Sequence, residues 1–234
     1  MKVLGIDTSG YTNAVGVTDG ERILADFTFE AKTDSLEKIV SNIDFALRKA
    51  NLQLEDIQGF GVGLGPGSWT GIRVGVTVAK ILAYSTNKPV SGVPTLEVLA
   101  YNARNTPAQI CPIIYAGTKD TVYSAFYRTK NDTVNRVSEY YVGDLKGLSE
   151  RVKETTVFIG AEAKAYCQLI GQIVGISIDA IEGVPKGATV ALLAAIRLKR
   201  GESDDALSLE PLYLKESTAR AFMGRYTRSS QVKG

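Results

Sequence analysis

Residues 63–75 read GLGPGSWTGIRVG, and no other stretch of the chain says as much about its fold. The stretch follows the largely apolar segment 57–62 and precedes a long apolar run, so the pattern predicts a strand, a tight turn and a helix. Glycine permits positive φ and Pro66 fixes its own φ, which indicates a turn of defined shape. Ser68 is suited to cap a helix that begins near Trp69.

Small residues recur at every fourth position of this predicted helix. They are Gly71, Gly75, Ala79 and Ala83. Residues four apart lie on one face of a helix, so they form a ridge that another backbone can approach closely. The turn suggests a second function, because backbone N–H groups at a helix start can bind an anion. The run has neither the Lys-Ser/Thr end of a P-loop nor the spacing of a dinucleotide fingerprint, so a purely structural turn is the alternative.

The composition is that of an ordinary globular protein. A chain of 234 residues can form one large domain or two modest lobes. Its formal net charge of +2 gives no field strong enough to indicate nucleic-acid binding by itself. Two cysteines are too few for a disulfide framework, no apolar stretch reaches the length of a membrane span, and no signal peptide is recognisable. We therefore expect a cytoplasmic protein with no membrane partner.

The chain contains no histidine. This excludes a Ser-His-Asp or Cys-His catalytic apparatus, an HExxH zinc site and any metal site with a histidine ligand. Carboxylates, lysine, tyrosine and backbone groups are the groups that remain for chemistry. A peptidase is therefore the least supported class of function.

The order of the predicted elements indicates two related lobes. The first part gives three strands, a helix, a strand and a helix, which is the order of a ribonuclease H-like unit. These elements are expected at about 2–6, 13–17, 23–29, 35–50, 57–63 and 69–85. The second part repeats this order less regularly. Its strands are expected at about 110–116, 121–128, 134–141 and 156–159, and its helices at about 144–152, 162–170 and 189–200.

Two such units facing each other form an actin-like architecture. We therefore predict an α/β fold of the actin-like (ASKHA) type, a pair of ribonuclease H-like lobes. The polar segment 101–108 is the expected boundary, so the first lobe covers 1–104 and the smaller second lobe covers 105–205. The C-terminal segment 206–234 is expected to pack back on the first lobe.

The first predicted strand ends on Asp7, Thr8 and Ser9. In actin-like phosphotransferases an acid at this point helps to hold metal and phosphate, although the same residues can also cap a turn through backbone N–H groups. The matching turn of the second half has Ala116 and no acid. We expect at most a vestigial phosphate or nucleotide site, and no cofactor outside a complex with ATP or ADP and magnesium. Its residues would be Asp7, Thr8, Ser9, Gly65, Gly67 and Ser68.

Three segments of the chain are similar to the TsaB (YeaZ) family. They are GPGSWTGIRVG at 65–75, DTS at 7–9 and EPLYL at 210–214. The likeness spans nearly the whole chain, and the segment 65–75 is highly specific. The resemblance implies an actin-like pair of lobes and a part in forming threonylcarbamoyladenosine at position 37 of tRNA. The chain departs from the family pattern at Thr33-Asp34-Ser35, where a histidine is common, and at Ala116-Gly117-Thr118, where Asp-Ala-Arg is common.

The resemblance also implies partners. A TsaB-like protein is a non-catalytic subunit that binds and activates a TsaD-like catalytic paralogue through its first two helices, with a TsaE-like ATPase in the same pathway. A homodimer through the same helices is a further expectation, and tRNA would be met only indirectly. The alternative function is an active actin-like ATPase or phosphotransferase, which Asp7 favours and Ala116 disfavours.

The residues themselves suggest where a partner would bind. A helical wheel turns Leu36, Val40, Ile43 and Leu47 of the first helix inward and Phe45 outward. The second helix is apolar almost all round, which is typical of a helix that is wholly internal or covered on a second side. We predict that a partner helix packs on Gly71, Gly75, Ala79 and Ala83, with Phe45 as a neighbouring anchor. Burial of this ridge within its own lobe is the alternative.

The last residues of the chain are basic. After Pro211 the chain has five basic residues and one acidic residue, Glu216. The basic residues are Lys215, Arg220, Arg225, Arg228 and Lys233. A solvated terminus and an arm that touches RNA phosphate both agree with this pattern.

Overall fold

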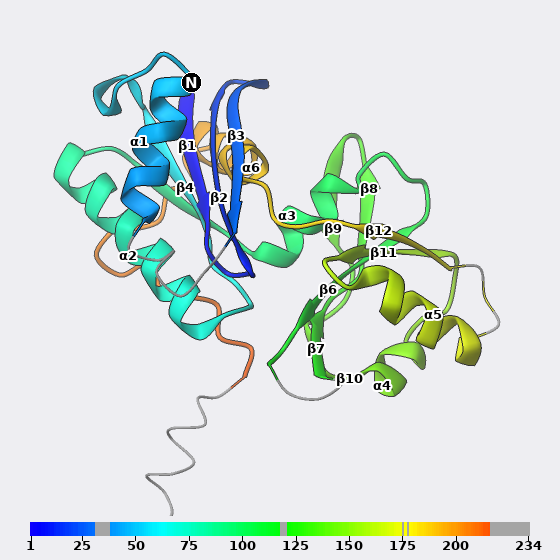
Figure 1. The fold of residues 1–234 in the computed structure, drawn as a ribbon. Helices are drawn as coiled ribbons and strands as arrows, with labels where there is room; N and C mark the ends of the chain where they lie inside the picture. The colour runs from blue at the N-terminus through cyan, green and yellow to red at the C-terminus, as the bar shows by residue number, and fades with distance from the viewer. Residues whose placement is uncertain (31–37, 118–120, 175, 177, 216–234) are drawn as a thin grey trace, which may run out of the picture.

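The computed structural model describes residues 1–30, 38–117, 121–174, 176 and 178–215. The chain forms two lobes, each built on its own sheet (Figure 1). The first sheet has the strand order β3-β2-β1-β4-β5. Its strands are β1 (Lys2–Asp7), β2 (Thr12–Asp19), β3 (Arg22–Glu30), β4 (Gly59–Gly63) and β5 (Val90–Val93). The strands β1, β2 and β3 run antiparallel, and β4 and β5 continue the sheet parallel to β1.

Helices cover both faces of this sheet. The helices α1 (Ile39–Lys49) and α2 (Trp69–Thr86) lie on one face, and α6 (Gly187–Lys199) lies on the other (Figure 1). The core beneath α1 and α2 is built from alternate strand residues such as Leu4, Ile6 and Phe60, as the period of two in a strand requires. A short 3-10 helix, η1 (Leu54–Asp56), joins α1 to β4.

The helix α6 approaches the sheet unusually closely. A Cβ on Gly5 would overlap Gly187 O and Ala191 N, and a Cβ on Gly16 would overlap Ala188 N. Small residues on both the sheet and the helix therefore permit this contact. Asp26 of β3 accepts a hydrogen bond from Ala188 N at 3.0 Å, which supplies a backbone donor at the start of the helix with an acceptor.

The second sheet has the order β10-β7-β6-β11-β12, with β8 paired to β6 and β9. Its strands are β6 (Gln109–Tyr115), β7 (Thr121–Ser124), β8 (Tyr127–Lys130), β9 (Thr133–Arg136), β10 (Tyr141–Asp144), β11 (Thr156–Gly160) and β12 (Ile178–Glu182). The helices α4 (Leu145–Ser149) and α5 (Ala163–Val174) pack on it, and α3 (Thr95–Asn102) lies between the lobes (Figure 1). None of the described helices is long and apolar enough to cross a membrane.

Several predicted elements differ from those in the structure. The predicted strands at 121–128 and 134–141 are each divided, because the chain changes partner between β7, β8, β9 and β10. The short strands β5 and β12 and the helix α3 were not predicted. The division into lobes at 1–104 and 105–205 stays a proposal, and α6, which that division assigns to the second lobe, packs on the first sheet.

The predicted inner face of α1 was partly wrong. The buried residues are Ile39, Ile43, Ala46 and Leu47, whereas Val40 is 64% exposed. The reason is a rotation of the helix that turns Val40 toward the gap beside α2. Leu36 and the segment Thr33-Asp34-Ser35 lie outside the described residues.

Candidate functional site

The turn before α2 has the defined shape that its sequence indicates. Gly65 has φ of +91°, and the peptide bond between Gly65 and Pro66 is cis. A Cβ on Gly67 would overlap Ser9 O, and Ser68 N donates to Ser9 O at 2.7 Å. The predicted cap is confirmed, because the Ser68 hydroxyl accepts from Gly71 N at 3.3 Å. The turn is therefore packed against the end of β1.

Asp7 lies at the centre of this contact and is buried. One carboxylate oxygen accepts from Ser9 N at 2.8 Å and from the Ser9 hydroxyl at 2.6 Å. The other accepts from the Thr95 hydroxyl at 2.9 Å, and Thr95 in turn accepts from Gly65 N at 3.2 Å. Asp7 thus joins the end of β1 to the glycine turn and to the start of α3.

Burial raises the pKa of Asp7, and the hydrogen bonds from Ser9 and Thr95 only partly oppose this. Each carboxylate oxygen already accepts hydrogen bonds within the protein. The structure brings together all six residues predicted as a vestigial phosphate site. These residues are joined by internal hydrogen bonds and close packing. This arrangement fits a structural role better than an anion-binding site.

The predicted small-residue ridge was wrong as a surface for a partner. Gly71, Gly75, Ala79 and Ala83 are all buried within the first lobe. A Cβ on Gly71 would overlap Thr8 O, and a Cβ on Gly75 would overlap Thr8 Oγ1. Thr8 also donates its hydroxyl hydrogen to Gly71 O at 2.6 Å. The small residues therefore let α2 approach the end of β1, as the alternative interpretation proposed.

The described ring–ring contacts of Phe45 are with β3. Its ring is 40% exposed and packs edge-on against Phe27 of β3, with ring centroids 4.9 Å apart. Phe29 lies 6.0 Å away, and Lys49 stands over the Phe45 ring at 5.4 Å. Phe45 therefore packs toward β3, one of the strands with which α1 makes contact.

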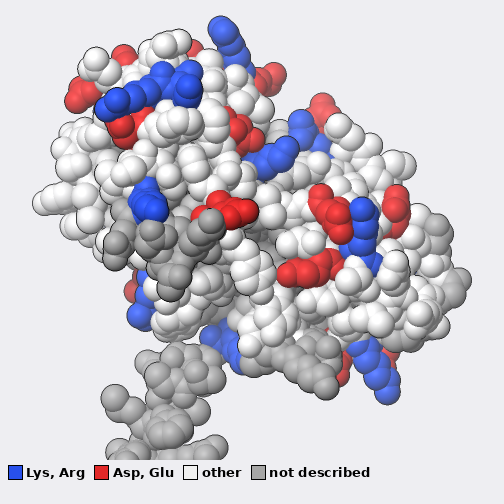
Figure 2. All heavy atoms as spheres, in the orientation of Figure 1, with Lys and Arg blue, Asp and Glu red and all other residues white. Residues whose placement is uncertain are grey.

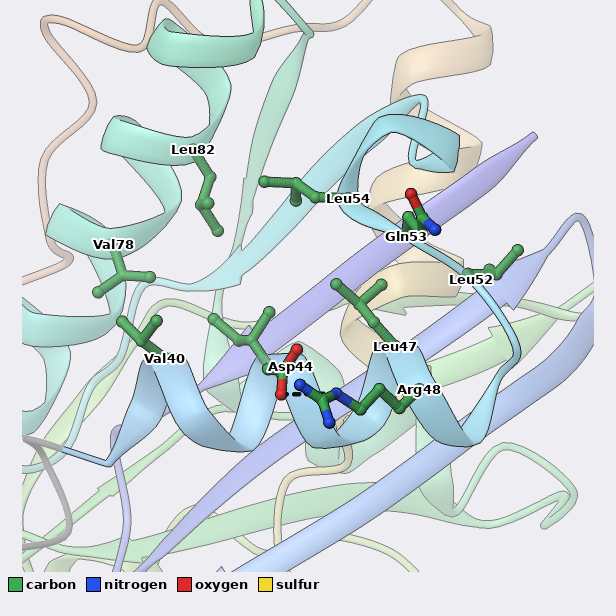
Figure 3. A pocket seen from close by; sticks show the side chains of 10 residues that line it. Val40, Asp44, Leu47, Arg48, Leu52, Gln53, Leu54, Val78 and Leu82 are labelled. Carbon is green, nitrogen blue, oxygen red and sulfur yellow. Dashed lines mark ion pairs between the residues drawn. The ribbon is translucent and has the colours of Figure 1, made fainter.

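The exposed apolar surface lies instead where α1 meets α2. Val40 of α1 is 64% exposed and Ile81 of α2 is 60% exposed. Between the two helices is a hollow of about 410 Å³, shown in Figure 3. It is lined by Val40, Ile43, Asp44, Leu47, Arg48, Leu52, Gln53, Leu54, Val78 and Leu82. We call Val40, Val78, Ile81 and Leu82 the docking face.

Polar groups on the docking side lie mainly along α1. Asp44 and Arg48 form an ion pair at 2.9 Å on the edge of the hollow (Figure 3). This pair is exposed, so it contributes little to the stability of the fold. Val40 directly follows Ile39, which is buried, so helical spacing alone could have placed Val40 away from the centre of the buried face. The sequence does not show where α2 lies relative to α1.

The part of the chain that the structure describes contains no group of three or more cysteine, aspartate or glutamate side chains placed to hold a metal ion. In the turn of the second lobe, Ala116 and Gly117 follow β6, and Thr118 lies outside the described residues.

Across the lobes, burial raises the pKa of Tyr11, and the nearby Glu162 and Tyr115 add to this effect. Tyr11 of the first lobe therefore lies near the second lobe.

Comparison with known proteins relates the whole chain to two groups. The family model described as "TsaD: tRNA N6-adenosine threonylcarbamoyltransferase" matches residues 29–220. The tRNA threonylcarbamoyladenosine biosynthesis protein TsaB of Bacillus subtilis is 30% identical, over 94% of this chain and 97% of the relative. The TsaB protein of Escherichia coli is 24% identical, over 94% and 96%.

Solved structures show the same fold. YeaZ from Pseudomonas aeruginosa superposes with a TM-score of 0.77 at 23% identity, over 91% of this chain and 99% of that one. The ROK hexokinase from Thermus thermophilus gives 0.53 at 15% identity, over 85% and 100%. These likenesses confirm the predicted α/β, actin-like fold. From the model match and from the Bacillus subtilis relative, aligned over nearly the full length of both proteins, it follows that the chain belongs to the TsaB (YeaZ) family.

Proposed function

We propose that this chain is a non-catalytic subunit in threonylcarbamoylation of adenosine 37 of tRNA. It binds a TsaD-like catalytic paralogue through the docking face and thereby activates it. A TsaE-like ATPase acts in the same pathway, and the assembly works in the cytoplasm. The named relatives support the process, since the similar proteins of Bacillus subtilis and Escherichia coli are threonylcarbamoyladenosine biosynthesis proteins.

The observation that carries the docking proposal is the exposed apolar surface across α1 and α2. Val40 and Ile81 are large apolar residues with more than half of their surface in water, and they flank an apolar hollow. Contiguous apolar surface of this kind on a globular protein commonly marks an interaction site. An amphipathic helix of a partner could place its apolar side chains in the hollow between α1 and α2.

The kind of partner follows from the family relation. The TsaD model matches this chain over residues 29–220, which include both α1 and α2. A TsaD-like paralogue would therefore carry two helices equivalent to α1 and α2. Two related lobes can pair through the same surface on each, as in an isologous dimer. In the absence of the paralogue, two copies of this chain would form a homodimer through the same docking face.

The geometry of Asp7 supports a non-catalytic role. Its carboxylate is buried and accepts three hydrogen bonds from Ser9 and Thr95. A metal ion or phosphate would have to share Asp7 with these bonds, which anchor the glycine turn. We propose that the isolated chain needs no cofactor, and that ATP or ADP with magnesium binds only in the assembled complex. Steady turnover of ATP by the isolated chain would contradict this proposal.

The docking proposal is tested with two surface variants and a matched control. Ile81→Asp and Val40→Asp each put a charge on an exposed residue of the docking face. Leu169→Asp puts the same charge on an exposed apolar residue of α5, in the second lobe. We expect the first two variants to fold and to bind the TsaD-like paralogue at least tenfold more weakly in calorimetric titration, because a buried charge without a partner is costly at an interface.

The control should bind as the wild type does. Wild-type affinity in both docking-face variants would show that the paralogue does not bind there. If the isolated wild-type chain dimerises in sedimentation, the same two variants should be monomeric, since the homodimer would use the same face.

A further inference from the structure

The helix α3 belongs to the cores of both lobes. None of its eight residues is exposed, and in Figure 1 it lies between the lobes. Leu96, Leu99 and Ala100, at spacings of three and four, share one face and pack into the core of the second lobe. Val98 packs on the other side with residues of α6, in a cluster of the first lobe, and Tyr101 contacts both clusters. A change in the angle between the lobes would therefore disturb the packing of α3.

The start of α3 is bonded to the first lobe. Here, between β5 and α3, the chain passes from the first lobe to the second. Thr95 N donates to Gly65 O at 2.8 Å, and the Thr95 hydroxyl donates to the Asp7 carboxylate at 2.9 Å. The first crossing between the lobes is thus attached to the glycine turn and to the end of β1.

The end of α3 is bonded to the second crossing, where the chain returns from β12 to α6. Asn102 Nδ2 donates to Val184 O at 3.4 Å, and Asn102 Oδ1 accepts from the Thr189 hydroxyl at 2.7 Å. Val184 lies in the segment that crosses, and Thr189 lies near the start of α6 and is buried. One side chain of α3 therefore holds both the returning segment and the helix that it enters.

An ion pair joins the middle of α3 to α6. Arg197 Nη2 donates to the two carboxylate oxygens of Glu97 at 2.9 and 2.7 Å, and Arg197 Nη1 donates to Gly92 O in β5. The side chains of Arg197 and Glu97 are only 24% and 20% exposed. Burial raises the pKa of Glu97, and the charges of Arg197 and Arg136 partly oppose this. Loss of Arg197 would leave a largely buried carboxylate without its main partner.

These contacts differ from those expected of a hinge. Proteins with two lobes around a ligand commonly close by a hinge motion, in which a few residues absorb a change in φ and ψ. In this chain both crossings are bonded to α3, and α3 is packed into both cores. Close-packed cores do not deform continuously. In the space-filling view of Figure 2 the surfaces of the two lobes also meet in the middle of the face shown.

We propose that α3 is a rigid joint that fixes the angle between the lobes, so that the chain keeps a single arrangement of the lobes in solution. The ion pair between Glu97 and Arg197 sets this angle, because a largely buried pair requires one geometry of the two helices that carry it. The proposal goes beyond the proposed function and does not depend on which partner binds. It implies that the docking face and the second lobe meet a partner as one rigid body.

The angle is measured on the full chain as a distribution of distances between two spin labels, by double electron–electron resonance. Thr77→Cys in α2 and Ala165→Cys in α5 place one exposed label on each lobe. Cys167→Ser removes the more accessible native thiol. Cys111 is kept, because it is buried and burial raises its pKa to about 12, so it does not react with the label. We expect one narrow peak that magnesium ATP does not shift.

Two variants weaken the joint, and a third serves as the control. Arg197→Met keeps a long side chain and leaves Glu97 unpaired, and Asn102→Ala removes both bonds at the second crossing. Arg128→Met breaks a more exposed ion pair, with Glu154, that lies within the second lobe. We expect the distance distribution to become broader in Arg197→Met and in Asn102→Ala, by more than any difference between the control and the unmodified joint.

Two results would overturn the proposal. One is a broad or two-peaked distribution with the joint intact, or a distance that shortens when magnesium ATP is added. The other is a distribution that stays as narrow in Arg197→Met and Asn102→Ala as in the control. If circular dichroism shows that Arg197→Met does not fold, Glu97→Gln takes its place, since it keeps the shape and an acceptor oxygen. Ile81→Asp lies outside the joint and should leave the distribution unchanged, so this test does not depend on the docking proposal.

Discussion

At the scale of single residues, Asp7 illustrates how one position can suggest two functions. Its place at the end of the first strand is that of a phosphate-site acid, and the sequence alone left this open against a capping role. The structure places the Thr95 hydroxyl 2.9 Å from its carboxylate, and Thr95 is 88 residues away in sequence. A contact over that separation leaves no local pattern, so sequence analysis could not have found it.

The raised pKa of Asp7 predicts a pH-dependent stability. An aspartate whose pKa is raised in the folded state stabilises the fold fully below its ordinary value of 3.8, and this contribution is lost as pH rises through the folded-state pKa. Asparagine keeps an acceptor for Ser9 and does not titrate. We expect the unfolding free energy of the wild type, relative to Asp7→Asn, to fall as pH rises from 3.8 toward neutrality. Urea unfolding at several pH values measures this, and a difference that is constant with pH would contradict it.

Gly75 provides a second residue-scale test. A Cβ at this position would overlap the Thr8 hydroxyl oxygen, whereas a Cβ on the exposed helical Gly171 of α5 meets only the end of the flexible Ile178 side chain, at 3.3 Å. We expect Gly75→Ala to lower the unfolding free energy by about 1–3 kcal/mol, since overpacking outweighs the gain in helix propensity. Gly171→Ala should be neutral or stabilising by up to about 1 kcal/mol. Urea unfolding of both variants tests this, and equal stability of the two would contradict the packing role of the ridge.

At the scale of elements, local sequence patterns predicted where helices and strands lie better than they predicted which of these elements contact one another. The glycine turn, the Ser68 cap and the helix after it could be inferred because turn chemistry and helical spacing are local properties. The strand β5 was missed since its four residues are too few for a pattern. The place of α6 was missed because the glycines that accept it, Gly5 and Gly16, lie in strands at the other end of the chain.

The candidate site shows the same limit. The spacing of Gly71, Gly75, Ala79 and Ala83 correctly indicated a close helix contact, but not that the other backbone was the end of β1. The outer surface of α2 was recognisable as unusually apolar. Its relation to Val40 depends on the crossing of two helices, which no single stretch of sequence determines.

The segment 203–214, which follows α6, contains a matched pair of leucines. Leu209 is buried in the core beneath α2, whereas Leu207 is 70% exposed. We expect Leu209→Ala to lower the unfolding free energy by about 2–5 kcal/mol, as for other buried leucines, because it leaves a cavity. Leu207→Ala should change it by less than about 0.5 kcal/mol. Thermal or urea unfolding of the two variants measures the difference, and similar values would show that the segment 203–214 is not part of the core.

At the scale of the whole molecule, we propose that the internal contacts of the first lobe and its docking face have separate roles. The glycine turn and Asp7 join the first lobe to α3, and the docking face lies outward between α1 and α2. In this account the chain contributes binding surfaces to an assembly whose chemistry belongs to a paralogue.

The most direct test of this account is the rate at which the TsaD-like paralogue, supplied with its substrates and the TsaE-like ATPase, modifies adenosine 37 of tRNA. We predict little product without this chain, full activity with the wild type or Leu169→Asp, and less than a tenth of that activity with Ile81→Asp at a concentration where the wild type saturates. A paralogue that is equally active with Ile81→Asp, or with no added chain, would contradict the account.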